Sequence, residues 1–477
     1  MMESMWFLPD PWFAASVAFD VALVPGAPSA ALTQRRQRRL EALLDAARGS
    51  AFYRERFARH GSRLEQQPPV TKEALMLRFD DWVTDPRLNL AALRRFIADP
   101  ARIGQAFEGG YTVWESSGST GVSGVFVQDT QAMAVYDTLE ALRRPASAAW
   151  RRCADPFFAA ERIAFVGATG GHFASTVSLE RLRRLLPGMA RRLRGFSLLQ
   201  PRRDLLAALS AWQPTLLATY PTAALMLAEE AEAGRLDLPL AEVLTGGEAL
   251  SEAVRAAISR GLCCPVHASY GASEFLALAS ECDQQHLHLN SDWAILEPVD
   301  ASGRPVPDGE PGHTVLLTNL ANHVQPLIRY DLGDRVRLDP KRCACGSALP
   351  VVEVQGRVDD ALLLTAADGH GVRLPPLALT TVLEEDAGLF DFQLVQEGPR
   401  QLDLTVVHDG GEAALACARR VLIAHLRAQG LTGLRLEVQR GVPQVQGRTG
   451  KLPRVVNRCA VNPAPDPAKG ERQTAPA

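Results

Sequence analysis

Hydroxyl and glycine residues are concentrated in one short stretch of the sequence, ESSGSTGVSG at residues 115–124. Its glycines, Gly118, Gly121 and Gly124, occur at every third position, and glycine permits positive φ angles and a close approach of the backbone to a ligand. Backbone N–H groups and hydroxyls in such a loop can surround an anion, so the stretch predicts a phosphate-binding loop. A solvated Ser/Gly linker is the alternative that composition alone allows. Neither GxGxxG nor Gly-Lys-Ser/Thr occurs here, which excludes a dinucleotide fingerprint and a P-loop.

Five further glycine-punctuated stretches follow in order: LTGGEAL (244–250), ASYGASEF (268–275), RYDLGD (329–334), GRVDD (356–360) and GRTGK (447–451). Each of them alone is typical of a turn. Their order and spacing, together with the phosphate loop, resemble the motif series of the adenylate-forming superfamily of acyl-CoA synthetases, adenylation domains and luciferases. The resemblance is strongest to the phenylacetate-CoA ligase and coenzyme F390 synthetase-like branch. It spans roughly residues 37–455, and the segments SAFYRERFARHG and PPVTKEAL are similar to the opening of that branch.

The resemblance implies an ATP/AMP site on these stretches. Its residues would be Ser116, Ser117, Gly118, Ser119, Thr120, Gly121, Gly247, Glu248, Ser269, Tyr270, Gly271, Asp334 and Arg357. Tyr270 would lie against the adenine, and Asp334 would accept hydrogen bonds from both ribose hydroxyls. Arg357 would contact the ribose or the α-phosphate through its planar guanidinium. Taken alone, Asp334 could equally be a turn residue, and Arg357 part of a surface ion pair.

Three residues are implied to be catalytic by the same resemblance. Ser273 would contact phosphate, and Glu274 would hold Mg²⁺, which prefers oxygen ligands and binds through few carboxylates plus substrate phosphates. Lys451, in the stretch GRTGKLPRVV, matches the lysine that the family brings into the adenylation site from its C-terminal domain. A flexible ammonium there can bridge the carboxylate and the α-phosphate as charge develops. A solvated lysine in a glycine-rich loop is the alternative.

Two departures from the family pattern concern charge and the acceptor. Gly124 occupies a place where many members have a lysine, so a positive contact to phosphate is lost there. After GRVDD, the family's short acceptor-facing segment is replaced by ALLLTAADGHGVRLPPL. The resemblance implies a domain rotation about the hinge residue Asp359 and transfer to the thiol of CoA. The replaced segment leaves a carrier-protein thiol and an amine open as alternative acceptors.

Two sequence segments are placed by the resemblance where the family lines its acyl pocket, FVGATGGHFAST and ATYPTAALMLAEE. The candidate pocket residues are His172, Phe173, Tyr220, Pro221 and Gly246. Small residues beside a few flat rings favour an aromatic carboxylic acid, benzoate- or phenylacetate-like, over a long alkyl chain. His172 could equally be a hydrogen-bonded histidine of the core.

Cysteine and histidine occur in a second combination, ECDQQHLHLNSDW followed by RCACGS. Cys282, His288, Cys343 and Cys345 predict a tetrahedral zinc site of structural type, with His286 as the alternative to His288. The C-x-C spacing is less typical than C-x₂-C, but many phenylacetate-type relatives carry cysteines at these places. Reduced thiols are the alternative, as expected for Cys263, Cys264 and Cys417.

The elements that must position these residues are predicted to be α/β. Helical patterns alternate with short apolar runs that end in small residues, such as RIAFVGA, TLLATY and AEVLTGG, which indicates parallel strands with crossover helices. Strand-and-turn patterns follow from about residue 290, and FQLVQ, LDLTVVH and LRLEVQR predict strands around a helix at 412–428. Nearer the N-terminus, one helical pattern covers residues 36–60 and ends at Gly61, and Thr71 is the predicted N-cap of the next helix.

We therefore expect a large N-terminal adenylation domain at residues 1–357, with a parallel sheet and a β-rich part. A small mobile α+β domain at 358–459 would carry Lys451, and the Pro/Ala-rich residues 460–477 would be a disordered tail. A chain of 477 residues exceeds a single compact core, which agrees with this division.

The bulk composition is that of an ordinary globular protein, with 47% hydrophobic and 22% charged residues. The net charge of -3 gives no electrostatic reason to expect a nucleic-acid or membrane partner, and the basic cluster at residues 35–39 is interpreted as the polar face of a helix. No signal peptide or apolar span is predicted, so a cytoplasmic monomer or homodimer is expected.

The expected function is ATP-dependent activation of an aryl acid to an acyl-AMP, followed by thioester formation with CoA. Besides ATP, Mg²⁺ and CoA, the expected cofactors include a structural Zn²⁺. An acyl carrier protein is the alternative partner, and a non-catalytic nucleotide-binding relative is the alternative of another class. Retention of Glu274, Asp334, Arg357 and Lys451 argues against that last reading.

Overall fold

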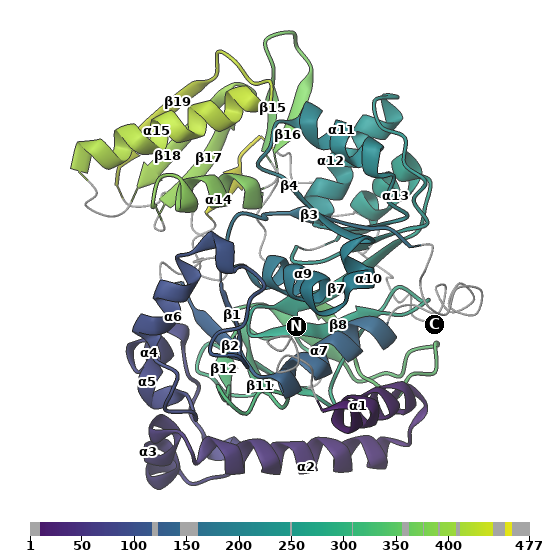
Figure 1. Ribbon diagram of the computed structural model, residues 1–477, viewed down its shortest axis with the longest axis vertical. Coiled ribbons are helices and arrows are strands. Elements are labelled where there is room, and N and C mark those ends of the chain that lie inside the picture. Colours follow the sequence, from purple (N-terminus) through teal and green to yellow (C-terminus); the bar gives the residue numbers. More distant parts are fainter. Residues whose placement is uncertain are drawn as a thin grey trace, which may run out of the picture.

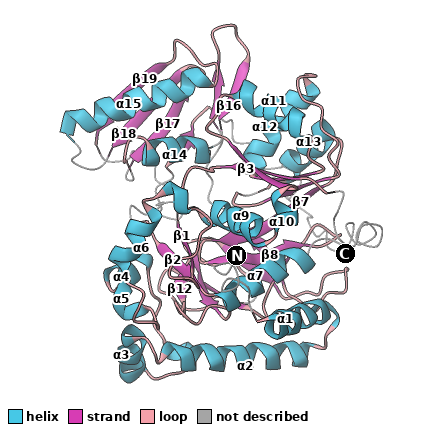
Figure 2. Cartoon of the chain, viewed as in Figure 1, coloured by secondary structure: helices cyan, strands magenta, loops and turns pink. Residues whose placement is uncertain are grey.

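The computed structural model describes residues 10–116, 123–143, 161–248, 250–307, 309–354, 362–374, 376–389, 392–406, 411–441 and 454–459. In these ranges the chain forms a large unit, which ends with strand β14, and a smaller C-terminal unit, which begins with β15 (Figure 1). Figure 2 shows that both units combine helices with sheets, which confirms the α/β class predicted from the sequence. The predicted tail at 460–477 lies outside the described residues.

The described residues 10–102 are mainly helical. The helices are α1 (Pro11–Leu23), α2 (Ser29–Ala47), α3 (Ala51–His60), α4 (Lys72–Leu77), α5 (Phe79–Trp82) and α6 (Leu90–Ile97), with short 3-10 turns at Val24–Gly26, Leu64–Gln66 and Pro100–Arg102. The single helix predicted over 36–60 is two helices, because the Ser50 hydroxyl caps a new one by accepting the N–H of Tyr53. Gly61 ends α3 at φ +88°, and Thr71 caps α4, as predicted. None of the described helices combines the length and apolar composition needed to cross a bilayer.

One nine-stranded sheet is the frame of the large unit, in the order β13-β14-β9-β8-β7-β6-β5-β3-β4. Its strands are β3 (Ile163–Gly167), β4 (Leu193–Ser197), β5 (Leu216–Thr219), β6 (Glu242–Thr245), β7 (Val266–Ala272), β8 (Phe275–Glu281), β9 (Leu287–Leu289), β13 (Val336–Asp339) and β14 (Val351–Val354). From β4 to β7 the neighbouring strands are parallel, and from β7 to β13 they are antiparallel. The sequence predicted the parallel half, but not that the antiparallel half continues the same sheet.

Crossover helices connect the parallel strands. They include α9 (Ala174–Leu185), α10 (Pro187–Ala190), α11 (Arg202–Trp212), α12 (Pro221–Glu232) and α13 (Glu252–Leu262), while α7 (Thr130–Leu142) precedes the sheet. A core of buried aliphatic residues, among them Val166, Leu217 and Val243, fills the space between strands and helices. Because a parallel sheet is covered on its faces, its strands are nearly continuous apolar runs, as seen in RIAFVGA and TLLATY. The carboxyl ends of these strands meet at one edge of the sheet, where ligands bind in open α/β folds.

Two smaller sheets complete the large unit. The hairpin of β1 (Thr112–Glu115) and β2 (Val125–Gln128) lies on either side of the predicted phosphate loop. A three-stranded sheet contains β10 (Ala294–Val299), β11 (Thr314–Asn319) and β12 (Tyr330–Asp331). A second large core joins both sheets to the N-terminal helices and includes Trp82, Trp114 and Tyr330.

The C-terminal unit has its own core. Its elements are the hairpin β15 (Leu362–Thr365) and β16 (Gly371–Leu374), α14 (Pro376–Glu385), β17 (Phe392–Gly398), β18 (Gln401–Val406), α15 (Gly411–Ala428), β19 (Arg435–Arg440) and β20 (Val455–Asn457). The four-stranded sheet has the order β19-β18-β17-β20. The strands and the helix predicted from FQLVQ, LDLTVVH, LRLEVQR and residues 412–428 are confirmed as β17, β18, β19 and α15.

The two units meet beside α11 and α12 (Figure 1). The Arg373 guanidinium donates to Glu229 on α12 at 3.0 Å, and Arg202 of α11 donates to the Arg373 carbonyl at 2.9 Å. The Gln429 side chain, just beyond α15, donates to the Gln200 carbonyl at 3.0 Å, and Ala378 of α14 packs into the core beneath the crossover helices. Among the described residues, the contacts combine these hydrogen bonds with apolar packing, and relative motion of two such units is the default expectation.

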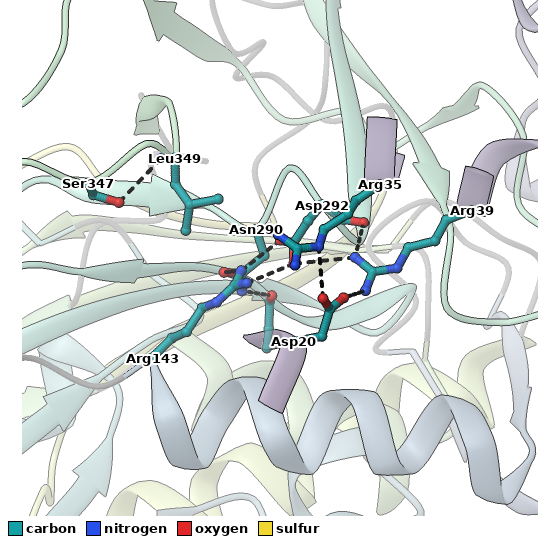
Figure 3. A network of polar contacts seen from close by, with 9 residues as sticks. Asp20, Arg35, Arg39, Arg143, Asn290, Asp292, Ser347 and Leu349 are labelled. Carbon is teal, nitrogen blue, oxygen red and sulfur yellow. Dashed lines mark hydrogen bonds and ion pairs between the residues drawn. The ribbon is translucent and has the colours of Figure 1, made fainter. Parts of the chain in front are cut away.

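A buried ionic network fastens the first two helices to the large unit (Figure 3). Arg143, at the end of α7, donates to Asp292 at 2.7 Å, and Arg39 of α2 donates to the Asp292 carbonyl at 2.7 Å. Asp20 of α1 pairs with both Arg35 and Arg39. Two arginines of the basic cluster at 35–39 are therefore internal partners, which agrees with its interpretation as a helix face.

Candidate functional site

A large cavity opens at the carboxyl ends of the parallel strands. Its volume is about 1740 Å³, more than the several hundred Å³ of an ordinary ligand pocket. The predicted residues that line it are Ser116, Phe173, Tyr220, Pro221, Gly246, Gly247, Glu248, Ser269, Tyr270, Gly271, Ser273, Glu274 and Asp334. The structure thus brings to one cavity residues that are more than 200 positions apart in the sequence.

The stretch ASYGASEF forms the end of β7 and the turn into β8. The Tyr270 hydroxyl and Asp334 Oδ2 are 2.9 Å apart, so the tyrosine and the carboxylate lie side by side although their motifs are separated by 64 residues. Gly271 has no room for a side chain, because a Cβ there would lie 1.9 Å from the Leu276 carbonyl oxygen. This glycine therefore allows the two strands to approach and presents Tyr270 and Asp334 together.

The next residues, Ser273 and Glu274, are held by their carbonyl groups. Trp114 Nε1 donates to the Ser273 carbonyl at 2.8 Å, and Asn319 Nδ2 donates to the Glu274 carbonyl at 2.9 Å. The Glu274 carboxylate accepts a hydrogen bond from the Tyr330 hydroxyl at 2.6 Å. Its side chain lines the cavity with only 8% of the residue exposed. A cavity-lining carboxylate fits the preference of Mg²⁺ for oxygen ligands.

The two ends of the predicted phosphate loop are joined to one another. The Ser116 hydroxyl accepts the N–H of Gly124 at 3.0 Å, and the Ser123 hydroxyl donates to the Ser116 carbonyl at 2.9 Å. A Cβ on Gly124 would lie 2.9 Å from the Phe126 ring and 3.1 Å from the Ser116 hydroxyl, so a lysine at this place would displace its neighbours. Ser117, Gly118, Ser119, Thr120 and Gly121 lie outside the described residues.

A cation that the sequence analysis did not single out lines the same cavity. Lys72 is the first residue of α4 and follows the N-cap Thr71, and both residues line the cavity with Ser116 and Glu274. Lys72 thus supplies a positive charge to a cavity in which Gly124 offers none. In the sequence, the signal for Lys72 was its place in PPVTKEAL, directly after the predicted N-cap Thr71.

The predicted acyl side of the cavity contains the two glycines of LTGGEAL. Gly247 adopts φ +78°, and a Cβ there would lie 3.1 Å from the Tyr220 ring, so the bare backbone rests against the aromatic face. Glu248 accepts hydrogen bonds from the N–H and the hydroxyl of Thr222, both at 3.0 Å. Thr222 is in the first turn of α12, where unpaired N–H groups favour a carboxylate. The segment therefore has a fixed position relative to Tyr220.

Not every predicted pocket residue faces the cavity. Phe173 and Pro221 line it, whereas the His172 ring packs against Phe96 with centroids 5.7 Å apart, and His172 is 2% exposed. Burial lowers the pKa of His172, which favours the neutral imidazole. This placement agrees with the alternative that His172 is a histidine of the core.

The C-terminal unit contributes the opposite wall of the cavity. Leu363, Thr365 and Arg373 of the β15–β16 hairpin line it, as do Arg454 and Asn457 near β20. The guanidinium of Arg454 lies over the Phe392 ring at 4.7 Å, which fixes the backbone three residues beyond Lys451. Lys451, Arg357 and Asp359 themselves lie outside the described residues.

The cysteines and histidines predicted to bind zinc form a second cluster. The ligand atoms of Cys282, His288, Cys343 and Cys345 all lie within 4.8 Å of one another. Cys282 and Cys343 Sγ are 3.8 Å apart, and His288 Nε2 is 3.3 Å from Cys345 Sγ. His286 Nδ1 also lies 3.3 Å from Cys343 Sγ. Four such ligands at this separation have the composition of a structural zinc site.

The geometry distinguishes the two histidines. His288 Nδ1 is 2.8 Å from the Leu349 carbonyl, which can only accept, so Nδ1 carries the proton and Nε2 presents a lone pair to the cysteines. A backbone carbonyl commonly orients a zinc-binding histidine in this way. For Cys343, burial disfavours the thiolate, but hydrogen bonds from the Cys345 N–H and from His286 outweigh it and lower the pKa to about 6. The thiolate is the form that binds metal.

Comparison with known proteins agrees with this architecture. Residues 116–317 match the family model described as AMP-binding enzyme. The chain is similar to 2-hydroxyisobutyryl-CoA ligase bound to 2-HIB-AMP and CoA in the thioesterification state, with 21% identity, a TM-score of 0.56 and 91% of each chain covered. It is also similar to that ligase in the postadenylation state with 2-HIB-AMP, with 20% identity, a TM-score of 0.53 and 91% of each chain covered. Among the curated proteins, none matches the sequence.

The fold is that of the similar ligase, and residues 116–317 match the AMP-binding enzyme model. The match over this segment and the fold agree with the resemblance derived from the motif series. The phenylacetate-CoA ligase branch stays a prediction.

Proposed function

We propose that the protein is an AMP-forming acid:thiol ligase, which uses ATP and Mg²⁺ to convert a carboxylic acid to an acyl-AMP and then to a thioester. The observation that carries the proposal is the single cavity that contains Ser116, Glu274 and the Tyr270–Asp334 pair and that the C-terminal unit closes on one side. A cavity lined by the large unit and by a small second unit suits two successive reactions in one cleft, because movement of the small unit changes the lining. The similar fold of a ligase described with an acyl-AMP and CoA supports it.

Each residue type has a definite task in this reaction. Tyr270 would cover the adenine while Asp334 accepts hydrogen bonds from the ribose hydroxyls. Ser116 and the rest of the phosphate loop would donate to the β and γ phosphates, with Lys72 adding positive charge. Mg²⁺, held by Glu274, would neutralise phosphate charge. Lys451 would stabilise the charge on the α-phosphate as the substrate carboxylate attacks and pyrophosphate leaves.

The roles of Ser117, Gly118, Ser119, Thr120, Gly121 and Arg357 remain those that the resemblance implies. The same holds for Asp359 as the hinge and for a boundary near residue 357 between a catalytic domain and a mobile C-terminal domain. The few polar contacts between the two units support such movement.

We expect the acid to be aromatic, benzoate- or phenylacetate-like. The support is the wall built from Phe173, Tyr220 and the bare backbone of Gly246 and Gly247, which presents flat surfaces at close range. Such a wall aligns a planar acyl group, and alignment of the carboxylate with the α-phosphate decides the rate. A small hydroxy acid is the second candidate, because the similar ligase is described in complex with 2-HIB-AMP.

The acceptor is proposed to be CoA. A carrier-protein thiol or an amine is the alternative, because the β15–β16 hairpin, with an Asp368–His370 pair at its tip, takes the place of the family's acceptor-facing segment. A structural Zn²⁺ at Cys282, His288, Cys343 and Cys345 completes the proposed cofactors.

Pyrophosphate release over a panel of acids tests the proposal. Benzoate, hydroxybenzoates, phenylacetate, 2-hydroxyisobutyrate, octanoate and palmitate should each be measured with and without CoA. An aryl acid should have the highest kcat/KM, and CoA should accelerate turnover. Faster turnover of palmitate than of every aryl acid would refute the aromatic assignment, and the absence of release with any acid would refute the ligase.

A further inference from the structure

Tyr330, the second residue of RYDLGD, lies directly behind the proposed metal carboxylate. Its hydroxyl donates to Glu274 Oε1 at 2.6 Å, and Tyr330 is only 2% exposed. In the part of the chain that the structure describes, this is the one hydrogen bond to the carboxylate of Glu274. Oε2 therefore keeps its lone pairs for a ligand in the cavity, while Oε1 is held in place.

The position of Tyr330 is itself fixed from two sides. It pairs with Leu317 where β12 meets β11, and it forms a bridge with Val70 on the other side. The N–H of Asp331 donates to the Val70 carbonyl at 2.9 Å, and the N–H of Val70 donates to the Arg329 carbonyl at 3.0 Å. A buried ring on a backbone paired on both sides has little freedom, so the hydroxyl defines a fixed point.

The turn that carries Glu274 is anchored independently of its carboxylate. Trp114 and Asn319 hold the carbonyl groups of Ser273 and Glu274. These contacts fix the backbone of the turn. Burial restricts the Glu274 side chain, and among the described residues the Tyr330 hydroxyl is the hydrogen-bond partner that orients its carboxylate. Trp114 lies two residues before Ser116, so the same anchor relates the turn to the phosphate loop.

We infer that Tyr330 is a positioning residue, whose hydroxyl orients the Glu274 carboxylate so that its second oxygen binds the Mg²⁺ that accompanies ATP. The inference rests on the proposed function for the identity of the metal. Residues behind a metal ligand typically change metal affinity by about 10- to 100-fold when they are removed. Tyr330 would therefore act on the metal requirement and not on the chemical step once metal is bound.

The substitution Tyr330→Phe deletes the hydroxyl and keeps the ring. Half-saturation of ATP binding by Mg²⁺, measured by calorimetry, should require about 10-fold more Mg²⁺ or more, and pyrophosphate release should show the same shift. At saturating Mg²⁺ the kcat should return to within a few-fold of the wild type. Tyr53→Phe is the matched control, because Tyr53 is also buried in this core and its hydroxyl accepts the N–H of Ile328 at 3.2 Å.

A double-mutant cycle separates positioning from a loss of stability. In a Glu274→Gln background, Tyr330→Phe should no longer alter the Mg²⁺ requirement, since the carboxylate through which it acts is gone. Equal Mg²⁺ titrations for the wild type and Tyr330→Phe, or equal shifts for Tyr330→Phe and Tyr53→Phe, would overturn the inference. Wild-type protein that binds ATP with Mg²⁺ but releases no pyrophosphate would refute the ligase proposal alone, and the binding titration would still test Tyr330.

Discussion

At the scale of single residues, glycines determine which side chains can meet in the cavity. Gly271 allows β7 and β8 to approach, Gly247 allows the backbone to lie on the Tyr220 ring, and Gly124 allows the phosphate loop to close on Ser116. In each case a Cβ would lie at or below 3.1 Å from a neighbour. The glycine-punctuated stretches are thus places where the backbone packs closely against neighbouring residues. This close packing lets the residues beside the glycines line one cavity.

Gly271→Ala should destabilise the protein and disrupt the nucleotide site. The new Cβ would overlap the Leu276 carbonyl, so the strands must separate, and overpacking of this kind costs about 1–3 kcal/mol. The free energy of unfolding from denaturant titration and the Kd for ATP are the measurements. Gly110→Ala is the control, since nothing lies within 4 Å of a Cβ there. An unchanged Kd for ATP in Gly271→Ala would contradict this account.

Lys451→Ala should abolish acyl-adenylate formation and leave thioester formation from a supplied acyl-adenylate nearly intact. Removal of one charged donor from a transition state typically costs about 3 kcal/mol, which is on the order of a hundredfold in rate. Pyrophosphate release reports the first half-reaction, and consumption of synthetic acyl-AMP with CoA reports the second. Lys341→Ala, on a turn after β13, is the control. Equal loss of both half-reactions would exclude the assigned role.

At the scale of elements, the antiparallel half of the nine-stranded sheet carries the cysteine–histidine cluster. Cys282 follows β8, His288 is in β9, and Cys343 and Cys345 lie between β13 and β14. Strands β9 and β14 pair through a single residue pair, His288 and Val351. A metal held by the cluster would therefore link β8 and β9 to β13 and β14. A metal at this place would stabilise the sheet where its hydrogen bonding is weakest.

Purified protein should contain about one zinc per chain, and the Cys343→Ser, Cys345→Ser double variant should lose both the metal and thermal stability. The reason is that metal binding energy at a structural site is folding energy. Elemental analysis and thermal unfolding are the measurements, with Cys263→Ser as the control at an exposed thiol outside the cluster. Metal-free protein, prepared without chelator, would count against the zinc site.

At the scale of the whole molecule, the C-terminal unit is held to α11 and α12 by a small interface that contains a buried histidine. His425 of α15 lies there with Gln429 and Arg373, next to Arg202 and Met226 of the large unit. Within the part of the chain that the structure describes, its Nε2 has no hydrogen-bond partner, and burial lowers its pKa to about 4. A proton on this ring would be placed in an apolar interface beside two arginines.

The stability of this interface should therefore decrease as the pH is lowered. An exposed histidine titrates near 6.5, so from about pH 6.5 down to about 4 the unfolded form binds a proton that the folded form does not, and stability decreases over that window. The full effect is about 3 kcal/mol at the lower end. Hydrogen exchange of the α15 amides at pH 7 and pH 4.5 measures it. His425→Leu should lose less protection on acidification than the wild type, and an equal loss in both would contradict the prediction.

The sequence by itself determined the local elements and the resemblance. The apolar runs RIAFVGA, TLLATY and AEVLTGG became β3, β5 and β6, and the motif series pointed to the AMP-binding enzyme model that residues 116–317 match, because both depend on short-range patterns that survive in any tertiary context. Ser116, Tyr270, Glu274 and Asp334 could be proposed from those motifs, and Cys282, Cys343 and Cys345 from residue type and spacing.

The tertiary structure alone decided which side chains meet. It merged the parallel and antiparallel strands into one sheet, split the pattern at 36–60 into two helices, and turned His172 toward Phe96. It also chose His288 over His286 as the better-oriented ligand and brought Lys72 and Tyr330 to the cavity. These outcomes depend on contacts between residues far apart in the chain, and a local pattern holds no information about a partner some 200 residues away.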